Sequence, residues 1–261
     1  MNILNKIVEF KKGEVARNKN LISITELEQQ EYFNRKTFSF KYFLLDETKT
    51  GIIAEFKRRS PSKGIINDKA DVLDVTTAYT KHGASCLSIL TDMEFFGGSA
   101  DDLRKARVNN IPILRKDFII DEYQLIEAKA MGADVILLIA ACLIPDRVKE
   151  LAFFAKSLNM EVLLEIHTEQ ELHHICNDVD FVGVNNRDLK TFSVDVNRSI
   201  ELSKQIPAEK IKIAESGIDD IGTIKIFKDA GFKGFLIGEK FMKEPDPGIA
   251  FEQFVRKLKQ G

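Results

Sequence analysis

The feature that most constrains the fold is a regular alternation of short apolar runs and longer helical patterns, which begins after Gly51. The runs are apolar at consecutive positions, as strands buried on both faces are. The segments between them show helical spacing, and capping patterns such as Thr168 with Glu171 mark where several begin. The eight predicted strands cover residues 52–56, 86–90, 111–114, 135–139, 161–166, 181–184, 212–214 and 234–237.

Long connections between short buried strands indicate crossover helices and therefore parallel pairing. Eight such units favour an α/β fold, a (β/α)8 TIM barrel. An open doubly wound sheet is the alternative, but no G-x-G-x-x-G follows the first strand, and Lys63-Gly64 lacks the preceding glycines of a Walker loop. The predicted helices cover residues 71–82, 99–109, 121–131, 145–158, 168–176, 195–205, 219–230 and 248–259.

The first fifty residues precede the first strand and carry helical patterns of their own, from Ile3 onward and again over residues 25–35. This block is too short for much of a core, so we expect it to pack on the barrel. The prediction is one TIM-barrel domain over residues 1–261, with residues 1–50 as an N-terminal helical extension and residues 51–261 as eight βα units.

Charge and cysteine content limit the partners of the chain. It carries 38 Lys and Arg against 40 Asp and Glu, so no overall positive field would attract nucleic acid. Cys86, Cys142 and Cys176 form no C-x-x-C pair, which fits reduced thiols in a cytoplasm. No segment reaches the roughly 18 consecutive apolar residues of a membrane span. We expect a cytoplasmic protein without membrane or nucleic-acid partners, and a monomer, with an oligomer left open.

Charged residues stand at the carboxyl ends of several predicted strands: Glu55, Lys57, Lys116, Glu165 and Glu215. In a barrel these ends meet at one mouth, where active sites lie. Side-chain alternation turns the last three toward the same face as the apolar residues two positions earlier. We therefore expect three carboxylates and two lysines to converge on one opening.

Lysines among carboxylates suit general acid and base catalysis. Carboxylates hold Lys57 and Lys116 as ammonium ions while partial desolvation lowers the lysine pKa, and this balance would leave a proton donor ready for transfer. A Schiff-base lysine is the alternative, but it needs a neutral amine and fewer carboxylates nearby. The acid role is favoured.

Small residues after the last two strands indicate a phosphate site. Ser216-Gly217 and Gly238-Glu239 place backbone N–H groups where many barrels bind phosphate, and Ser60 in the first loop adds a hydroxyl. Together they favour a phosphorylated small-molecule substrate.

Other prominent side chains carry weaker signals. Phe95, Phe96 and Phe118 follow strands two and three, where they are either core residues or the rim of a site for an aromatic substrate. His167 is close to the mouth but reads as a loop residue, and His82 and the pair at positions 173 and 174 read as solvated helical residues. Without H-E-x-x-H or cysteine partners, no metal site is predicted.

Five motifs stand at or beside the predicted strands: EFKRRSPSKG at 55–64, LRKDFIID at 114–121, LLE at 163–165, GVNNRDL at 183–189 and AESGI at 214–218. Together they resemble the indole-3-glycerol-phosphate synthase family of tryptophan biosynthesis, and the resemblance covers nearly the whole chain. Phe56 and Arg59 depart from the family pattern, in which Ile or Val is more frequent at the first position and Ala at the second. Some members carry serine in place of Glu239.

The resemblance implies a carboxy-lyase that closes the ring of 1-(2-carboxyphenylamino)-1-deoxyribulose 5-phosphate with loss of carbon dioxide and then water, without cofactor or metal. Lys116 would be the general acid and Glu165 the base or proton carrier of the dehydration. Lys57 would pair with the substrate carboxylate and Glu55 would orient the lysines.

The resemblance also implies the binding residues. Asn185, Glu215 and Ser216 would contact the ribulose part, with Arg187 supporting the site and Phe118 at its aromatic rim. The phosphate cradle would consist of Ser60, Gly217, Gly238 and Glu239.

Two alternatives differ from this hypothesis. Phosphoribosylanthranilate isomerase would need an Asp and Cys pair at strand ends, which the sequence does not offer. A barrel that only binds phosphorylated ligands would have no need of Lys116 and Glu165 together.

Overall fold

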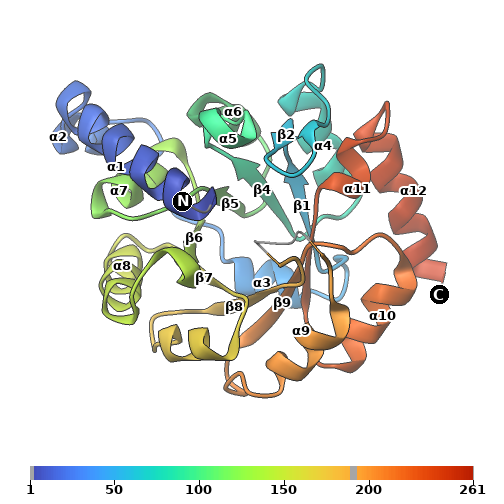
Figure 1. Ribbon diagram of the computed structural model, residues 1–261. Coiled ribbons are helices and arrows are strands. Elements are labelled where there is room, and N and C mark those ends of the chain that lie inside the picture. Colours follow the sequence, from blue (N-terminus) through green and yellow to red (C-terminus); the bar gives the residue numbers. More distant parts are fainter. Residues whose placement is uncertain (1–2, 189–192, 261) are drawn as a thin grey trace.

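The computed structural model describes residues 3–188 and 193–260. Within these residues eight parallel strands close into a barrel, each hydrogen-bonded to the next in chain order and the last, β10, to the first, β1 (Figure 1). The predicted TIM barrel is confirmed. Its strands are β1 (Ile52–Phe56), β4 (Cys86–Leu90), β5 (Ile113–Lys116), β6 (Val135–Ile139), β7 (Glu161–Ile166), β8 (Phe181–Asn185), β9 (Ile211–Glu215) and β10 (Gly234–Ile237).

Helices surround the barrel on the outside (Figure 1). None of those in the described residues is long and apolar enough to cross a membrane. In chain order they are α4 (Val72–Lys81), α5 (Met93–Phe96), α6 (Ala100–Ala106), α7 (Glu122–Met131), the 3₁₀ helix η1 (Ala140–Cys142), α8 (Pro145–Ser157), the 3₁₀ helix η2 (Glu169–His174), α9 (Val196–Ser203), α10 (Ile221–Asp229), α11 (Glu239–Met242) and α12 (Pro247–Gln260).

Local signals explain several of these boundaries. Asp121 caps α7 in a capping box with Gln124, and Thr168 caps η2 in another with Glu171. Ser99 accepts the backbone N–H of Asp102 at the start of α6, but that pair does not form the full reciprocal box. The predicted helix at residues 168–176 is a 3₁₀ helix instead of an α-helix.

The strands alternate as predicted. Leu137 on β6 faces the barrel interior, in a buried cluster that also holds Ile53 and Leu163, whereas Ile136 and Leu138 belong to the larger cluster between the strands and the helices. The same alternation turns the last inward-facing side chain of each strand toward the mouth.

The N-terminal extension consists of α1 (Ile3–Leu21), α2 (Ile24–Glu28) and α3 (Phe40–Leu45). The helix expected over residues 25–35 ends at Glu28, and α3 was not predicted. Leu189, the last residue of the motif that begins at Gly183, lies outside the described residues.

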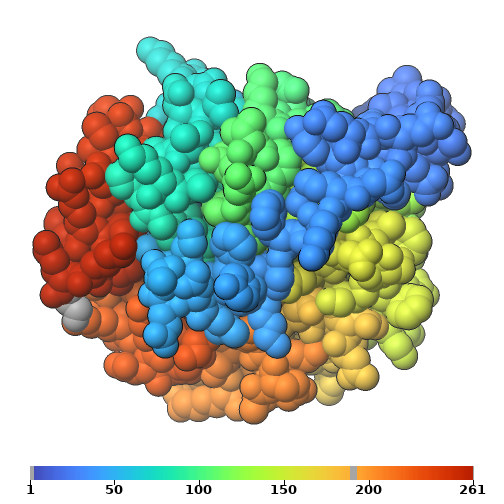
Figure 2. Space-filling model, turned by 180° about the vertical axis from the view of Figure 1, so that it is seen from behind, coloured from blue at the N-terminus to red at the C-terminus, as the bar shows by residue number. Residues whose placement is uncertain are grey.

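The extension contacts both ends of the barrel. Ile7 of α1 joins the interior cluster near the carboxyl ends of the strands, and Phe40 and Leu44 of α3 join it at their amino ends. The Phe40 ring packs against Phe181, the first residue of β8, with 4.5 Å between centroids. Figure 2, from behind, shows the segment around α3 lying across the face opposite the view of Figure 1. These shared clusters support the single-domain organisation, which stays a prediction.

Candidate active site

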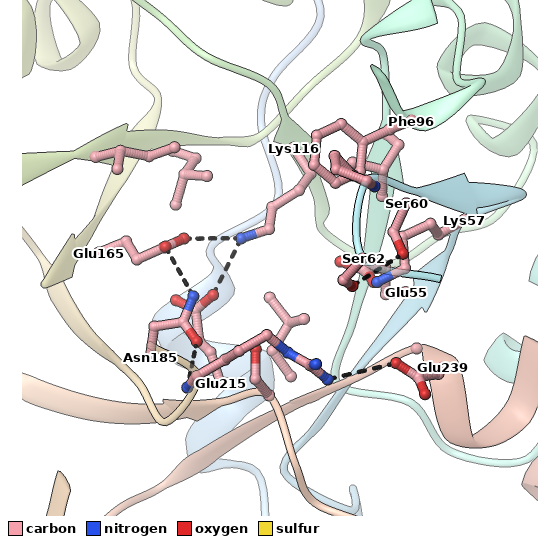
Figure 3. Close-up of a pocket in the computed structure, with 18 of the residues that line it drawn as sticks. Glu55, Lys57, Ser60, Ser62, Phe96, Lys116, Glu165, Asn185, Glu215 and Glu239 are labelled. Carbon is pink, nitrogen blue, oxygen red and sulfur yellow. Dashed lines mark hydrogen bonds and ion pairs between the residues drawn. The ribbon is translucent and has the colours of Figure 1, made fainter. Parts of the chain in front are cut away.

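One pocket opens at the carboxyl ends of the strands, and every residue proposed from the sequence as catalytic or binding lines it (Figure 3). The geometric expectation of convergence is met, while the role of each side chain stays a prediction. The residues are Glu55, Lys57, Ser60, Lys116, Phe118, Glu165, Asn185, Arg187, Glu215, Ser216, Gly217, Gly238 and Glu239.

Lys116 lies at the centre of the polar part. It is the last residue of β5, and its Nζ lies 3.0 Å from Oε2 of Glu165 on β7 and 3.0 Å from Oε2 of Glu215 on β9. The Lys116 side chain therefore reaches across the mouth of the barrel to β7 and β9, neither of which is a neighbour of β5 (Figure 3).

Glu165 is held from several directions. Its Oε2 accepts from Lys116, and its Oε1 accepts from Nδ2 of Asn185 at 2.9 Å. The same Oε1 lies 3.2 Å from Nε2 of His167, whose Nδ1 lies 3.5 Å from Glu171. The hydrogen bonds from Lys116 and Asn185, together with the ion pair with His167, hold the carboxylate in one orientation.

The two carboxylates that contact Lys116 have pKa values shifted in opposite directions. Burial disfavours the charged form of Lys116, but attraction to Glu165 and Glu215 outweighs it and raises the lysine pKa. Burial also acts to raise the pKa of Glu165, yet Lys116 and His167 outweigh it and lower that pKa. For Glu215 burial prevails over Lys116 and raises the pKa to about 7. Both effects expected from the sequence act on Lys116, and the carboxylates outweigh desolvation. Lys116 is therefore held as an ammonium ion, which disfavours the Schiff-base alternative.

Two glycines make room for buried carboxylates. A Cβ on Gly183 would lie 2.1 Å from Oε1 of Glu215, and one on Gly238 would lie 2.5 Å from Oε1 of Glu55. Both distances are far below van der Waals contact. Gly238 therefore has a packing reason to be glycine in addition to its predicted place in the phosphate cradle.

Glu55 and Lys57 form a second charged pair at the end of β1. Lys57 Nζ lies 2.5 Å from Oε1 of Glu55, whose side chain is almost fully buried. Glu55 also contributes to the raised pKa of Lys116, which links the two charged groups electrostatically.

The loops after β1, β9 and β10 form the side of the pocket predicted for phosphate. Ser60 belongs to a hairpin of β2 (Arg59–Ser60) and β3 (Gly64–Ile65), which was not predicted. Ser216 has a φ of 68°, which is strained for a residue other than glycine, and its carbonyl accepts a 2.7 Å bond from Asn186. The Glu239 side chain contacts Arg187 at 3.4 Å and Lys63 at 3.6 Å, so its carboxylate is directed toward two cations.

The opposite side is apolar. Phe96 and Phe118 line it with ring centroids 6.0 Å apart, and Leu137 and Ile139 of β6 add aliphatic surface. Helix α1 closes this side with residues that were not predicted from the sequence, namely Ile3, Leu4 and Ile7.

From the sequence, His167 was interpreted as a loop residue, but in the structure it contacts the carboxylate of Glu165. It is buried beside Glu165, and the carboxylates of Glu165 and Glu171 raise its pKa to about 9 against the effect of burial. Its position two residues after Glu165 was the available signal, because alternation carries both side chains to one face. His174 is also not simply solvated, since its Nε2 lies 2.9 Å from the Leu143 carbonyl.

The carboxylates at the mouth of the barrel are paired with the ammonium groups of Lys57 and Lys116. Among residues 3–188 and 193–260, His, Cys, Asp and Glu side chains form no group of three or more that could hold a metal ion.

Comparisons with known proteins agree with the geometry. The family model for indole-3-glycerol phosphate synthase matches residues 4–257. A Bacteroides thetaiotaomicron protein of that name is 48% identical over 98% of this chain and 99% of its own length, and one from an Acidovorax species is 42% identical over 97% and 98%.

Solved structures that are similar at low identity support the fold alone. The tryptophan synthase A-subunit of Pyrococcus furiosus superposes with a TM-score of 0.61 at 16% identity over 82% of this chain and all of that one. The 3-hexulose-6-phosphate synthase of Salmonella typhimurium gives 0.62 at 11%, over 80% and 98%. By the match over almost its full length and by its curated relatives, the chain belongs to the indole-3-glycerol phosphate synthase family.

Proposed function

We propose that the pocket at the carboxyl ends of the strands carries out the reaction after which the family is named. The substrate is 1-(2-carboxyphenylamino)-1-deoxyribulose 5-phosphate, and the product is indole-3-glycerol phosphate. The observation that carries the proposal is the ammonium of Lys116, held 3.0 Å from both Glu165 and Glu215 inside a pocket with one apolar and one polar side.

The two sides of the pocket suggest how the substrate lies. Its carboxyphenyl ring would pack against Phe96 and Phe118, and its phosphate would bind near Ser60 and the loops that contain Gly217 and Gly238. The ribulose chain would then cross the centre of the pocket, beside Lys116. Lys57 would pair with the carboxylate of the ring.

Ring closure needs an acid at the ketone oxygen. The ring carbon that bears the carboxylate attacks the ketone carbon, and Lys116 donates a proton to the oxygen as its charge develops. The raised pKa of Lys116 keeps this donor charged at neutral pH. Such positioned proton transfer contributes roughly 10²–10⁴-fold to a rate.

Decarboxylation and dehydration complete the aromatic product. Cleavage of the carbon–carboxylate bond releases carbon dioxide and restores the benzene ring. The new hydroxyl then takes up a proton from the ammonium of Lys57 and leaves as water, while Glu165 accepts the proton lost from the adjacent carbon. The low pKa of Glu165 in the free protein means that it enters this step ionised. Asn185 and Glu215 would hold the ribulose hydroxyls, and Arg187 would support the site.

Compartment and assembly remain proposals of the same kind. Cys86, Cys142 and Cys176 are all free thiols in the structure, which supports a reducing cytoplasm. We propose a single domain, because Ile7, Phe40 and Leu44 of the extension share a buried cluster with the barrel strands, and we propose that it is a monomer.

The direct test is turnover of the carboxyphenylamino-deoxyribulose phosphate, followed by indole fluorescence. The chain contains no tryptophan, so no indole group of the protein contributes to the product signal. We expect Lys116→Met to lower kcat/KM by at least about 10²-fold, because it removes the acid and keeps the aliphatic stem.

Lys225→Met, on the exposed face of α10, is the matched control and should leave kcat/KM unchanged. Absence of product from the unsubstituted protein at micromolar concentration would refute the proposal. A Lys116→Met protein that binds substrate normally but does not turn it over would rule out a barrel that only binds its ligand.

A further inference from the structure

Helix α1 buries a lysine in the middle of its apolar face. Ile7, Lys11 and Val15 are its buried residues, spaced four apart, so they form one stripe along the helix. The Lys11 side chain is completely shielded from solvent. A charge at such a position is retained only with close partners.

Three carboxylates surround this ammonium. Lys11 Nζ lies 2.8 Å from Glu14 on its own helix, 3.0 Å from Oδ2 of Asp92 and 2.9 Å from Oδ1 of Asp117. Asp92 follows strand β4 by two residues and Asp117 follows β5 directly. One side chain of the extension therefore joins the ends of two neighbouring barrel strands.

Each aspartate holds part of the apolar side of the pocket. Oδ1 of Asp92 accepts the backbone N–H groups of Phe95 at 2.7 Å and Phe96 at 3.1 Å, and so caps α5. Oδ1 of Asp117 accepts the N–H of Phe118 at 2.8 Å. Phe96 and Phe118 are the two aromatic residues that line the pocket.

We infer that Lys11 is a positioning residue for the proposed reaction, which compensates the buried charge of Asp92 and thereby holds the Phe96 wall where the ring of the substrate binds. The inference rests on the proposed function, because that function assigns the substrate ring to this wall. Lys11 itself does not line the pocket.

The two aspartates depend on Lys11 to different degrees. Asp117 has a second cation, since Arg115 Nη2 lies 3.0 Å from its Oδ2, and Thr91 donates to the same oxygen. Asp92 is fully buried, and Lys11 is the one cation among the described residues that forms an ion pair with it. Loss of the ammonium would leave Asp92 as an isolated buried carboxylate, which turns toward water to solvate its charge. That turn would draw Oδ1 away from the N–H groups of Phe95 and Phe96 and so disturb the cap of α5.

Helix α1 has other attachments that do not involve this charge. Its Phe10 ring packs against Phe95 at 5.6 Å, its Asn18 donates to Glu127 at 3.0 Å, and the Asn18 carbonyl accepts from Tyr123. The effect of losing Lys11 should therefore be local to the wall of the pocket instead of a release of the whole helix.

The experiment compares Lys11→Met with Lys12→Met, the same substitution at the adjacent position, which is exposed and pairs with Glu9 alone among the described residues. For Lys11→Met we expect KM to rise about tenfold or more while kcat changes less, because the displaced wall weakens binding of the ring. Lys12→Met should match the unsubstituted protein. The Kd for indole-3-glycerol phosphate, read from the indole fluorescence of the ligand itself, should rise in parallel with KM.

The decisive variant is the double substitution Lys11→Met with Asp92→Asn. Asparagine keeps an oxygen that can cap α5 but has no charge to compensate, so KM and Kd should return most of the way to their original values. This charge-balanced protein also remains available if Lys11→Met alone does not fold. A lysine that served only to dock α1 would not be rescued by a change on a different element.

Normal KM and Kd in Lys11→Met, or a double variant as impaired as the single one, would overturn the inference. Failure of the proposed function looks different, since the unsubstituted protein would then form no product. The fluorescence Kd would still compare the variants in that case, and equal values throughout would refute the role of Lys11.

Discussion

At the scale of single residues, the site is built from charges that are buried only in matched groups. Lys116 is shared by Glu165 and Glu215, Glu165 is shared by Lys116 and His167, and Lys57 contacts Glu55. A cation or carboxylate taken out of such a group leaves its partner unpaired in a low dielectric, which costs more than the pair itself contributes. Substitutions here should therefore act on stability and activity together.

The pKa of His167 makes a prediction about stability and pH. The pKa is raised from an ordinary value near 6.5 to about 9, because Glu165 and Glu171 outweigh the effect of burial. The charged ring then stabilises the folded state fully below pH 6.5, and this contribution is lost as the pH rises through 9. Compared with His167→Gln, the unsubstituted protein should lose about 3 kcal/mol of unfolding free energy across that interval.

Urea denaturation of both proteins at several pH values between 6 and 10 measures this difference. Glu169→Gln, at an exposed acid of η2 just after His167, serves as the control and should run parallel to the unsubstituted protein. A constant gap between His167→Gln and the unsubstituted protein would mean that His167 does not change its charge in this range.

At the scale of elements, the eight strands and the presence of a helical extension could be predicted, but the bounds of the helices within the extension could not. Strand β6 reads Val135 to Ile139 without a polar residue, and its bounds were predicted as the structure has them. Residues 25–35 have a helix start at Ser23, but the pattern there does not reveal that α2 ends at Glu28. Tertiary contacts decide this segment: Arg35 reaches Asp134, and the N–H of Phe40 donates to Glu161.

The same contrast applies to the site. Residues at strand ends could be located because alternation and parallel pairing dictate where they point. Lys11 and Ile7 could not, because nothing in a local pattern says which part of the barrel a preceding helix will touch. His167 could have been found, since it follows Glu165 by two residues.

Gly183 on strand β8 allows a prediction about steric contact with Glu215. Gly183→Ala would place a Cβ 2.1 Å from Oε1 of Glu215, so the carboxylate must move away from Lys116. We expect kcat/KM to fall by about 10²-fold, as misplacement of a catalytic group does. Gly13→Ala is the control: it lies within α1, its Cβ would come no nearer than 3.5 Å to Arg17, and it should stabilise the protein by about 0.5–1 kcal/mol. Full activity in Gly183→Ala would show that Glu215 tolerates displacement.

At the scale of the whole molecule, the two ends of the barrel serve different purposes. The pocket lies at the carboxyl ends of the strands, and α3 covers their amino ends. Phe40 and Leu44 of α3 fill the barrel interior at that amino end. Separation of this kind allows the stability of the barrel to change without a change in the chemistry at the other end.

Phe40→Ala tests that separation. Phe40 is fully buried and does not line the pocket, so its truncation should cost about 3 to 5 kcal/mol of unfolding free energy through a cavity under the barrel. At a temperature where the variant remains folded, KM and kcat should stay within about threefold of the original. A large loss of kcat at full folding would show that the two ends are coupled. Denaturation and steady-state kinetics on the same preparation distinguish these results.

The attachment of α3 also has a consequence for how a nascent chain matures. Translation proceeds from the amino terminus, so Phe40 leaves the ribosome well before Glu161 and Phe181, the residues it contacts. Until those later segments emerge, the apolar face of α3 has no native surface to cover it and is open to chaperones or to other growing chains. Final docking of the earliest-made segment must therefore wait for more than half of the barrel to be synthesised.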